Sequence, residues 1–307
     1  MAPVIVFGPT GNVGSHAART AEKHGAKVYL AMRDTSKAIP GLTSDHENSG
    51  KFERVQADLN NADSVAAAIK STGATRAFVY LAHGQPDHMM STFSAMKSAG
   101  ITFVVFLSSY TIAMAGPEPA DVQPSEIISY MHAQAELSLR EIFGEESYVA
   151  LRPGNFATNS VRYKSDIAAG EVEMLGASFP ADGITPNDMG EVGGTILALG
   201  PKNGQHIVYL YGPEMLTQGA TSQIVGRVLG KEVKLKSQTP EVALEQMTRM
   251  FGSKPLAEYM VRMSTRDYEG AKFPYHEEGV ENIQLYTDRP ATKFEDWVKA
   301  NKELFST

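Results

Sequence analysis

A glycine-rich turn directly follows the first apolar run of the chain. Residues 4–7 read Val-Ile-Val-Phe, and residues 8–14 read Gly-Pro-Thr-Gly-Asn-Val-Gly. In a strand–turn–helix unit the first glycine permits the tight turn, the second leaves room for a pyrophosphate against the backbone, and the third lets the helix pack closely on the strand. The helix that follows presents unpaired N–H groups and its positive dipole end to phosphate. The pattern therefore predicts the first βαβ unit of a dinucleotide-binding fold, with phosphate contacts from Gly8, Thr10, Gly11, Asn12, Val13 and Gly14.

Basic residues stand at the end of the second predicted strand. That strand spans residues 27–31, Arg33 and Asp34 follow it, and Lys37 comes one turn later. An acid at this position holds the ribose hydroxyls of NAD, whereas a basic residue accommodates the 2′-phosphate of NADP. A guanidinium can pair with phosphate through two N–H groups at once. Arg33 and Lys37 therefore indicate NADP, while Asp34 keeps the ribose-binding alternative open.

Composition narrows the class of protein further. The chain has 307 residues, a formal net charge of −7 and no cysteine. The acidic balance gives no electrostatic basis for binding nucleic acid or an anionic membrane. Without cysteine there are no disulfides and no thiolate metal sites, and because the histidines are scattered we expect no metal site. No apolar run approaches the roughly 20 residues that span a membrane, and the N-terminus lacks a signal-peptide pattern. A soluble cytoplasmic protein is expected.

Apolar runs and amphipathic segments alternate through residue 151. We predict strands at 3–7, 27–31, 53–56, 76–82, 102–107 and 147–151, most of them apolar runs, with helices near 12–24, 61–72, 86–99 and 124–143. Continuous apolar runs are typical of strands that are buried on both faces of a parallel sheet. The sequence thus predicts an α/β fold, a doubly wound and mostly parallel Rossmann sheet, which binds ligands at the carboxyl ends of its strands.

The pattern changes after residue 151. Glycine and proline become frequent, and helices are predicted near 187–200, 217–230, 240–251, 254–265 and 291–304, while segment 266–290 stays unassigned. We therefore expect residues 1–151 to form the NADP-binding domain. Residues 152–307 are expected to form a smaller C-terminal substrate-binding lobe, with segments that return to the sheet.

Several further motifs occur in a definite order along nearly the whole chain. They are Ala57-Asp58-Leu59, Leu151-Arg-Pro-Gly-Asn-Phe156, Asp188-Met-Gly190, Tyr211-Gly-Pro-Glu214 with Leu216-Thr217, and residues 289–296, which read Arg-Pro-Ala-Thr-Lys-Phe-Glu-Asp. Together with the glycine turn, this set resembles the NmrA-like family of atypical short-chain dehydrogenases. That family includes NADPH-dependent reductases of small aromatic or unsaturated compounds, and also NADP-binding regulators without a demonstrated reaction.

The resemblance also implies positions around the cofactor. It implies that Asp58 and Leu59 lie by the adenine, and that Ala82 and His83 lie near the ribose and pyrophosphate. It places the stretch Pro153, Gly154, Asn155 and Phe156 near the nicotinamide.

The tyrosine–lysine dyad of ordinary short-chain dehydrogenases is absent. That dyad has a spacing of four residues on one helix, which puts both side chains on the same face. If Ala135-Glu136 sets the register, Ile128 replaces the tyrosine and His132 replaces the lysine. The alternative register pairs Tyr130 with Gln134, and no lysine occurs between residues 97 and 164.

Three substitutes for the dyad are available. Ser108 and Ser109 stand where ordinary short-chain dehydrogenases have their catalytic serine, and we expect Ser108 to contact the cofactor. Tyr110 directly follows them and is a candidate proton donor. His132 is a candidate for holding the cofactor ribose and for titrating near neutral pH. The loop at 116–126 carries acids that could protonate or hold a cationic substrate, with Glu118 first and Asp121 and Glu126 after it. The structural alternatives are a tyrosine that only packs and a loop that is only a solvated lid.

Two functions are compatible with these observations. The first is an NADPH-dependent reductase that passes hydride to a C=N, C=C or C=O bond of an aromatic or polycyclic small molecule. A narrower form of it places the reduction in secondary metabolism and couples it to a cyclisation. The aromatic residues of the C-terminal half favour such a substrate, and a cationic acceptor such as an iminium needs little proton donation. The second is a non-catalytic regulator that senses NADP(H) and binds a protein partner, which the missing dyad favours.

Overall fold

The central sheet is parallel and has the strand order β3-β2-β1-β4-β5-β6-β9 in the computed structural model, which describes residues 2–266, 268 and 273–306. Every strand pairing within this sheet is parallel. The strands are Val4–Phe7 (β1), Val28–Met32 (β2), Phe52–Gln56 (β3), Arg76–Tyr80 (β4), Phe103–Leu107 (β5), Tyr148–Pro153 (β6) and Ile207–Leu210 (β9). The structure thus confirms the predicted doubly wound parallel sheet and its six predicted strands.

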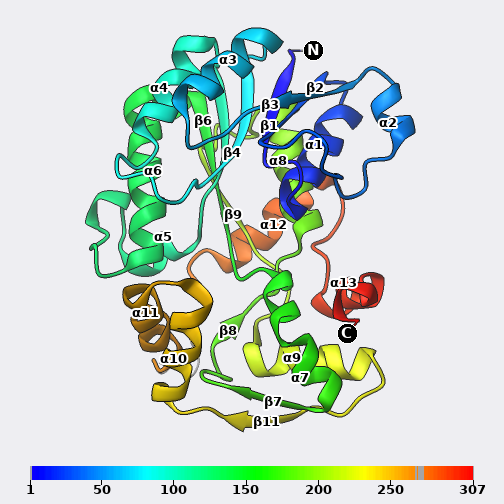
Figure 1. Ribbon diagram of the computed structural model, residues 1–307, viewed down its shortest axis with the longest axis vertical. Coiled ribbons are helices and arrows are strands. Elements are labelled where there is room, and N and C mark those ends of the chain that lie inside the picture. The colour runs from blue at the N-terminus through cyan, green and yellow to red at the C-terminus, as the bar shows by residue number, and fades with distance from the viewer. Residues whose placement is uncertain (1, 267, 269–272, 307) are drawn as a thin grey trace.

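Helices cover both faces of this sheet (Figure 1). One face carries α1 (Asn12–Lys23), α8 (Pro186–Leu199) and α12 (His276–Thr287), and the other carries α3 (Ala62–Thr72), α4 (Met90–Ala99) and α6 (Ile127–Phe143). Successive side chains of a strand point to opposite faces, so Val4 and Val6 belong to the first core while Ile5 and Phe7 belong to the second. Both cores are continuous across the sheet, which explains the unbroken apolar runs in the sequence.

The strand order reverses between β1 and β4. β1 pairs with β2 on one side and with β4 on the other. The crossovers therefore leave in opposite directions from β1, and a crevice forms at the carboxyl ends of the strands. The carboxyl ends of the strands point toward the second lobe of the molecule (Figure 1).

The second lobe is built mostly from segments after β6. Its helices are α7 (Lys164–Ala169), α9 (Gln218–Val228), α10 (Pro240–Phe251), α11 (Lys254–Ser264) and α13 (Phe294–Ala300), with the 3-10 segments η3 (Ala157–Tyr163) and η4 (Lys302–Phe305). Its strands form two small pairs, β7 (Glu171–Met174) with β11 (Lys234–Ser237) and β8 (Pro180–Ala181) with β10 (Leu216–Thr217). Four short elements lie elsewhere, namely α2 (Ser44–Asn48), α5 (Thr111–Ala115), η1 (Pro119–Asp121) and η2 (Glu145–Ser147).

Three segments after residue 151 return to the large sheet, namely α8, β9 and α12. The sequence left α12 unassigned because its start carries no recognisable signal: Tyr275, its N-cap, has φ +62° and makes no side-chain cap. Gly279 lies in its first turn, where a Cβ would stand 2.2 Å from the Tyr211 ring, so glycine is required for α12 to pack on β9. The division of the chain at residue 151 stays a prediction. Within the described residues, no helix has the length and hydropathy to cross a membrane.

Candidate active site

The glycine turn has the geometry of a phosphate cradle. Gly8 adopts φ +71°, and the Gly11 N–H donates to the Gly8 carbonyl at 3.0 Å. A Cβ on Gly14 would stand 2.3 Å from the Gly8 oxygen, so this glycine permits the close approach of α1 to the turn. A Cβ on Gly11 would meet its nearest neighbour at 3.4 Å, an ordinary contact. The protein itself therefore does not require glycine at position 11, whereas a pyrophosphate lying on the backbone there would.

A groove of about 350 Å³ runs from this turn along the carboxyl ends of the strands. Gly11 is the N-cap of α1 and makes no side-chain cap, and the first turn of α1 carries no acid, so its N–H groups are available to an anion. The residues that line the groove are Phe7, Gly8, Thr10, Gly11, Asn12, Val13, Gly14, Phe78, Tyr80, Leu107, Phe156, Thr158 and Pro186. The groove thus brings together all six predicted phosphate-contacting residues and Phe156.

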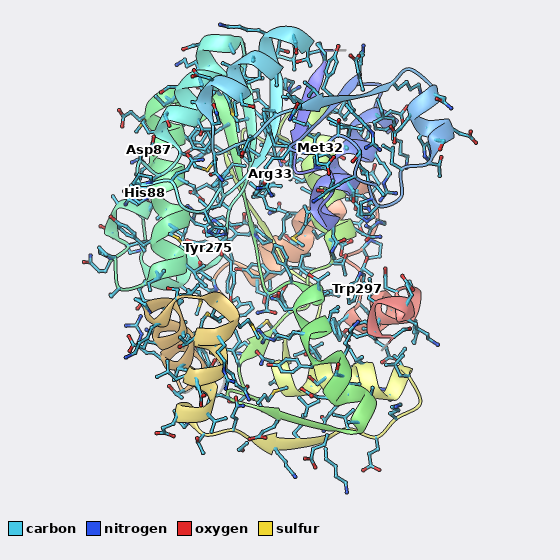
Figure 2. The ribbon with its side chains drawn as sticks, in the orientation of Figure 1. Met32, Arg33, Asp87, His88, Tyr275 and Trp297 are labelled. Atoms are coloured by element: carbon cyan, nitrogen blue, oxygen red, sulfur yellow. The ribbon has the colours of Figure 1, made fainter. Side chains whose placement is uncertain are left out.

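Arg33 lies exposed at the carboxyl end of β2, on the side that faces the second lobe (Figure 2). Lys37 is exposed as well. The carboxylate of Asp34 accepts from the hydroxyl of Ser36 at 2.6 Å and from its N–H at 3.0 Å, and these bonds lower the pKa of Asp34. Asp34 therefore closes its own turn, whereas the Arg33 guanidinium forms no ion pair or side-chain hydrogen bond within the part of the chain that the structure describes. A guanidinium at this place suits a 2′-phosphate, and the contacts of Arg33 and Lys37 with it stay predictions.

Tyr80 is a groove residue that sequence reasoning missed. It ends β4 and is 40% exposed, and its ring lies so close to Gly8 that a Cβ there would stand 2.6 Å from Cε1. Burial raises the pKa of its phenol, the charge of Arg33 lowers it and that of Asp58 raises it, so Tyr80 lies near both charged groups. The signal was available: β4 borders β1 at the switch point, and its last residue necessarily stands beside the glycine turn.

The other residues implied by the resemblance stand near the carboxyl ends of β3 and β4. Leu59 and Ala82 are buried, and His83 is exposed. The Leu59 carbonyl accepts from the Thr92 hydroxyl at 3.0 Å, and the carboxylate of Asp58 accepts from the Asn60 N–H at 3.0 Å. None of the four residues 58, 59, 82 and 83 lines the groove, so their cofactor contacts stay predictions.

A buried carboxyl holds the loop that begins with Pro153. The carboxylate of Asp182 accepts from the N–H of Asn155 at 2.6 Å and from that of Gly212 at 2.8 Å. A Cβ on Gly154 would stand 2.4 Å from an Asp182 oxygen, so the loop needs glycine beside the carboxyl. Burial raises the pKa of Asp182 to about 7. Asp182 could not be predicted from a local sequence pattern, because it lies 27 residues from the loop that it holds.

Ser108 points into the protein rather than into the groove. It is 4% exposed, and its hydroxyl donates to the Glu136 carboxylate at 2.5 Å. Glu136 in turn forms a two-pronged ion pair with Arg152, with N–O distances of 3.0 and 2.6 Å, and Arg152 donates to the Tyr209 hydroxyl at 2.9 Å. The contact of Ser108 with the cofactor therefore stays a prediction, and in the described structure its hydroxyl belongs to a buried network that joins α6, β6 and β9.

A second, larger cavity of about 460 Å³ opens beside the groove. Methionine and aromatic side chains supply most of its apolar lining: Met114, Met174, Met247, Met250, Met260 and Met263, with Tyr110, Phe156, Tyr163, Phe179, Phe251, Tyr259, Tyr268 and Phe273. Flexible, polarisable thioethers and aromatic faces adapt to flat apolar ligands. Phe156 lines both spaces, so the cavity and the groove meet at this ring.

Tyr110 lines the cavity and is 7% exposed. Its ring packs on Phe273 and Tyr211, with centroid distances of 4.7 and 6.0 Å. Its hydroxyl makes no hydrogen bond to another residue that the structure describes. Burial and the nearby carboxyl of Asp182 raise the pKa of this phenol well above its usual value. Tyr110 is therefore a protonated phenol at the cavity wall. It can donate a proton to a strongly basic group and cannot act as a base, and its raised pKa makes it a weaker acid than a free phenol.

Ile128 also lines the cavity, in the register that puts it at the usual tyrosine position. One turn later, the Nδ1 atom of His132 is buried and has no partner among the described residues. Burial, together with the neighbouring His83, lowers the pKa of His132 to about 3. The expectation that His132 titrates near neutral pH is therefore wrong, since its imidazole stays neutral there. His132 lines neither the groove nor the cavity.

The acidic loop contributes Glu126 to the cavity and not Glu118. Glu118 is exposed at the surface and outside the cavity lining. Glu126 lines the cavity and pairs with Arg262 at 3.2 Å and with Arg266 at 3.1 Å. Geometry therefore does not favour Glu118 as a proton donor. Among the described residues, no His, Asp and Glu side chains gather as metal ligands would.

The strand order, the glycine turn and the groove define a Rossmann protein that binds a dinucleotide. A family profile described as NAD(P)H-binding matches residues 8–192, and the chain belongs to this family and, within it, to the NmrA-like proteins. It is 34% identical to the nitrogen metabolite regulation-like protein bik4 of Gibberella fujikuroi, over 96% of this chain and 95% of that one. An NAD(P)H azoreductase of Xenophilus azovorans is 23% identical over 98% and 99% of the two chains.

Among solved structures, the quinone oxidoreductase QOR2 of Escherichia coli in complex with NADPH superposes with a TM-score of 0.74. That likeness covers 99% of this chain and all of the other, at 15% identity, so it concerns the fold. The family match and the groove together establish an NAD(P)H-binding protein that is related to NADP-dependent reductases.

Proposed function

We propose that the protein is an NADPH-dependent reductase of a small aromatic or polycyclic molecule. The observation that carries this proposal is the position of Phe156, which lines both the cofactor groove and the methionine-rich cavity. A flat apolar molecule in the cavity would therefore lie next to the end of the groove. The names of the azoreductase and quinone oxidoreductase to which the chain is similar support the reduction of such a molecule. For this chain we propose a C=N, C=C or C=O bond as the acceptor.

The proposed chemistry divides between the cofactor and this chain. The bound cofactor supplies a hydride to the acceptor carbon. Reduction of a neutral double bond leaves a negative charge on its other atom, and the Tyr110 hydroxyl is placed to donate the proton that neutralises it. This phenol is protonated before the charge develops, and because its pKa is raised it donates only to an anion that is more basic than a phenolate. The residues of the glycine turn hold the phosphates, and the apolar lining excludes water from the acceptor.

A narrower form of this proposal is a reduction coupled to a cyclisation in secondary metabolism. An adaptable apolar cavity supports it, because such a cavity can hold one folded conformer of a flexible substrate and bring its reacting atoms together.

The test is NADPH oxidation with a panel of azo dyes, triphenylmethane dyes, quinones and iminium ions. With an accepted neutral substrate, Tyr110→Phe should lower turnover by about 10²- to 10⁴-fold, the usual contribution of a positioned acid. The matched control is Tyr259→Phe, which removes a phenol from another part of the same cavity. Near-wild-type turnover in the Tyr110 variant would overturn its role as the donor.

A second candidate function is a regulator that senses NADP(H) and binds a protein partner. The absence of the dyad favours it, since Ile128 offers no phenol to the cavity, and so does the printed name of the relative bik4. Specific capture of one protein partner that depends on NADP(H), without oxidation of NADPH by any compound of the panel, would favour this function over the reductase.

A further inference from the structure

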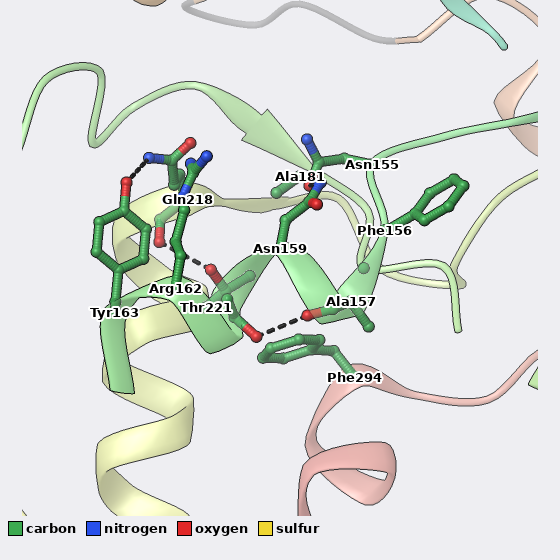
Figure 3. A pocket seen from close by; sticks show the side chains of 12 residues that line it. Asn155, Phe156, Ala157, Asn159, Arg162, Tyr163, Ala181, Gln218, Thr221 and Phe294 are labelled. Atoms are coloured by element: carbon green, nitrogen blue, oxygen red, sulfur yellow. Dashed lines mark hydrogen bonds between the residues drawn. The ribbon is translucent and has the colours of Figure 1, made fainter. Parts of the chain in front are cut away.

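One wall of the large cavity is polar. Asn155, Asn159, Arg162 and Gln218 all line it, and we refer to these four side chains as the polar strip. Asn155 follows the end of β6, Asn159 and Arg162 are spaced one turn apart on η3, and Gln218 begins α9. Figure 3 shows their polar ends gathered on the same side of η3. Three separate elements thus converge to place hydrogen-bond donors on one wall of an otherwise apolar cavity.

Most of the donors in this strip are free of protein partners. Within the described residues, the Arg162 guanidinium makes no ion pair and no hydrogen bond, and it lies 4.8 Å from the centroid of the Tyr163 ring. The Asn159 amide donates to the Asn155 oxygen at 3.3 Å, and the Gln218 amide donates to the Tyr163 hydroxyl at 2.6 Å. A guanidinium carries five N–H groups in a fixed plane and accepts nothing. The strip therefore offers donors to a ligand that carries acceptors.

The charges around the strip decide what kind of acceptor it fits. Asp166 and Glu173 line the same cavity and form no ion pair with Arg162. Glu126 and Arg266, which also line it, pair with each other at 3.1 Å. The described lining thus holds three carboxylates against two guanidiniums. A strip rich in donors within a lining that is not positive favours an uncharged oxygen over a carboxylate or phosphate.

We propose that the polar strip is the subsite that binds the carbonyl or quinone oxygens of a neutral polycyclic substrate. This inference rests on the proposed reductase function and names its substrate class. Asn155 adjoins Phe156, so an oxygen bound at this end of the strip lies on the wall nearest the cofactor groove. The methionine and aromatic lining holds the rings, and the strip sets their orientation. The strip is thus a determinant of which carbon of the substrate faces the groove.

The test measures binding and does not depend on turnover. Calorimetry in the presence of NADP⁺ compares naphthalene, 1,4-naphthoquinone and 1-naphthoate, which share their rings and differ in their oxygens. The chain has no cysteine, so thiols of the protein cannot trap the quinone. The variants are Arg162→Met and Asn159→Leu, both at exposed positions where folding should persist, and urea unfolding verifies this. The control is Arg249→Met on α10, where the guanidinium lies outside the cavity lining.

The quinone should bind more tightly than naphthalene and 1-naphthoate. Arg162→Met should weaken quinone binding by about tenfold or more, the usual effect of losing a hydrogen bond from a charged donor. Asn159→Leu should weaken it by a smaller factor, and Arg249→Met should leave it unchanged. Equal binding of the three probes, equal losses in Arg162→Met and Arg249→Met, or tighter binding of 1-naphthoate would overturn the proposal. Quinone binding with these effects but without NADPH oxidation would contradict the reductase function and leave the subsite in place.

Discussion

The glycine turn permits a test that separates the requirements of the fold from those of the cofactor. Gly11→Ala adds a methyl group whose nearest protein neighbour, the Gly8 carbonyl oxygen, lies at an ordinary 3.4 Å. Gly14→Ala adds the same methyl group 2.3 Å from the same oxygen, about 1 Å too close. Both variants replace a glycine with alanine. In Gly14→Ala the new methyl group obstructs the protein backbone, whereas in Gly11→Ala it obstructs the pyrophosphate of the cofactor.

Their expected magnitudes follow from this geometry. Gly11 has φ −84° and ψ 157°, which any residue adopts. Removing backbone freedom from the unfolded chain stabilises such a site by about 0.4–1 kcal/mol, while alanine is a poorer N-cap than glycine by a comparable amount. The free energy of unfolding should therefore change by less than about 1 kcal/mol. In Gly14→Ala the clash is with backbone, which costs about 1–3 kcal/mol.

Urea unfolding and NADPH titration together measure both effects. Gly11→Ala should keep its stability and bind NADPH at least about tenfold more weakly, because about 1.4 kcal/mol of obstruction corresponds to a factor of ten. The bulkier Gly11→Val should abolish binding while the protein still folds. The reasoning is refuted if Gly11→Ala retains wild-type NADPH affinity, or if it destabilises the protein as much as Gly14→Ala does.

Three further predictions concern charged groups. Arg33→Ala should cost about 2 kcal/mol in NADP binding and far less in NAD binding, and equal losses in calorimetry would contradict a 2′-phosphate contact. Arg152→Met should cost about 3–5 kcal/mol of stability in urea unfolding, because it leaves the Glu136 carboxylate buried without its cation. Adding Glu136→Leu should recover most of this loss, and a double variant as unstable as the single one would contradict it. The pKa of Asp182 is raised to about 7 from its ordinary 3.8, so the folded protein binds this proton more tightly than the unfolded chain does. The resulting stability is present below about pH 4 and is lost as the pH rises through 7. Asp182→Asn should remove that decline, and an unchanged slope in pH-dependent unfolding would exclude Asp182 as its source.

The Rossmann half of the molecule was determined by its local sequence. Most of the first six strands are apolar runs, because both faces of the sheet are covered and no alternation is needed. The exception is the edge strand β3, which reads Phe-Glu-Arg-Val-Gln. The glycine turn could also be predicted, because its glycines are required by local geometry. Gly8 has a positive φ, and Gly14 lies too close to the Gly8 carbonyl oxygen for a side chain. The position of Arg33 at the carboxyl end of β2 could be predicted because this residue directly follows that strand. Local sequence patterns are enough to predict the structure where the interacting residues lie in one βαβ unit.

Only the tertiary structure decided the rest of the site. Asp182 and the Asn155 N–H are 27 residues apart, and Arg152 and Tyr209 are 57 apart, and no local pattern relates positions at such separations. The pKa of His132 depends on the residues that bury it and not on the sequence of the helix that carries it, so its neutrality could not be predicted. The polar strip likewise exists only because η3 and α9 meet at one cavity wall. Burial and long-range packing set these properties, and they arise only when the whole chain has folded.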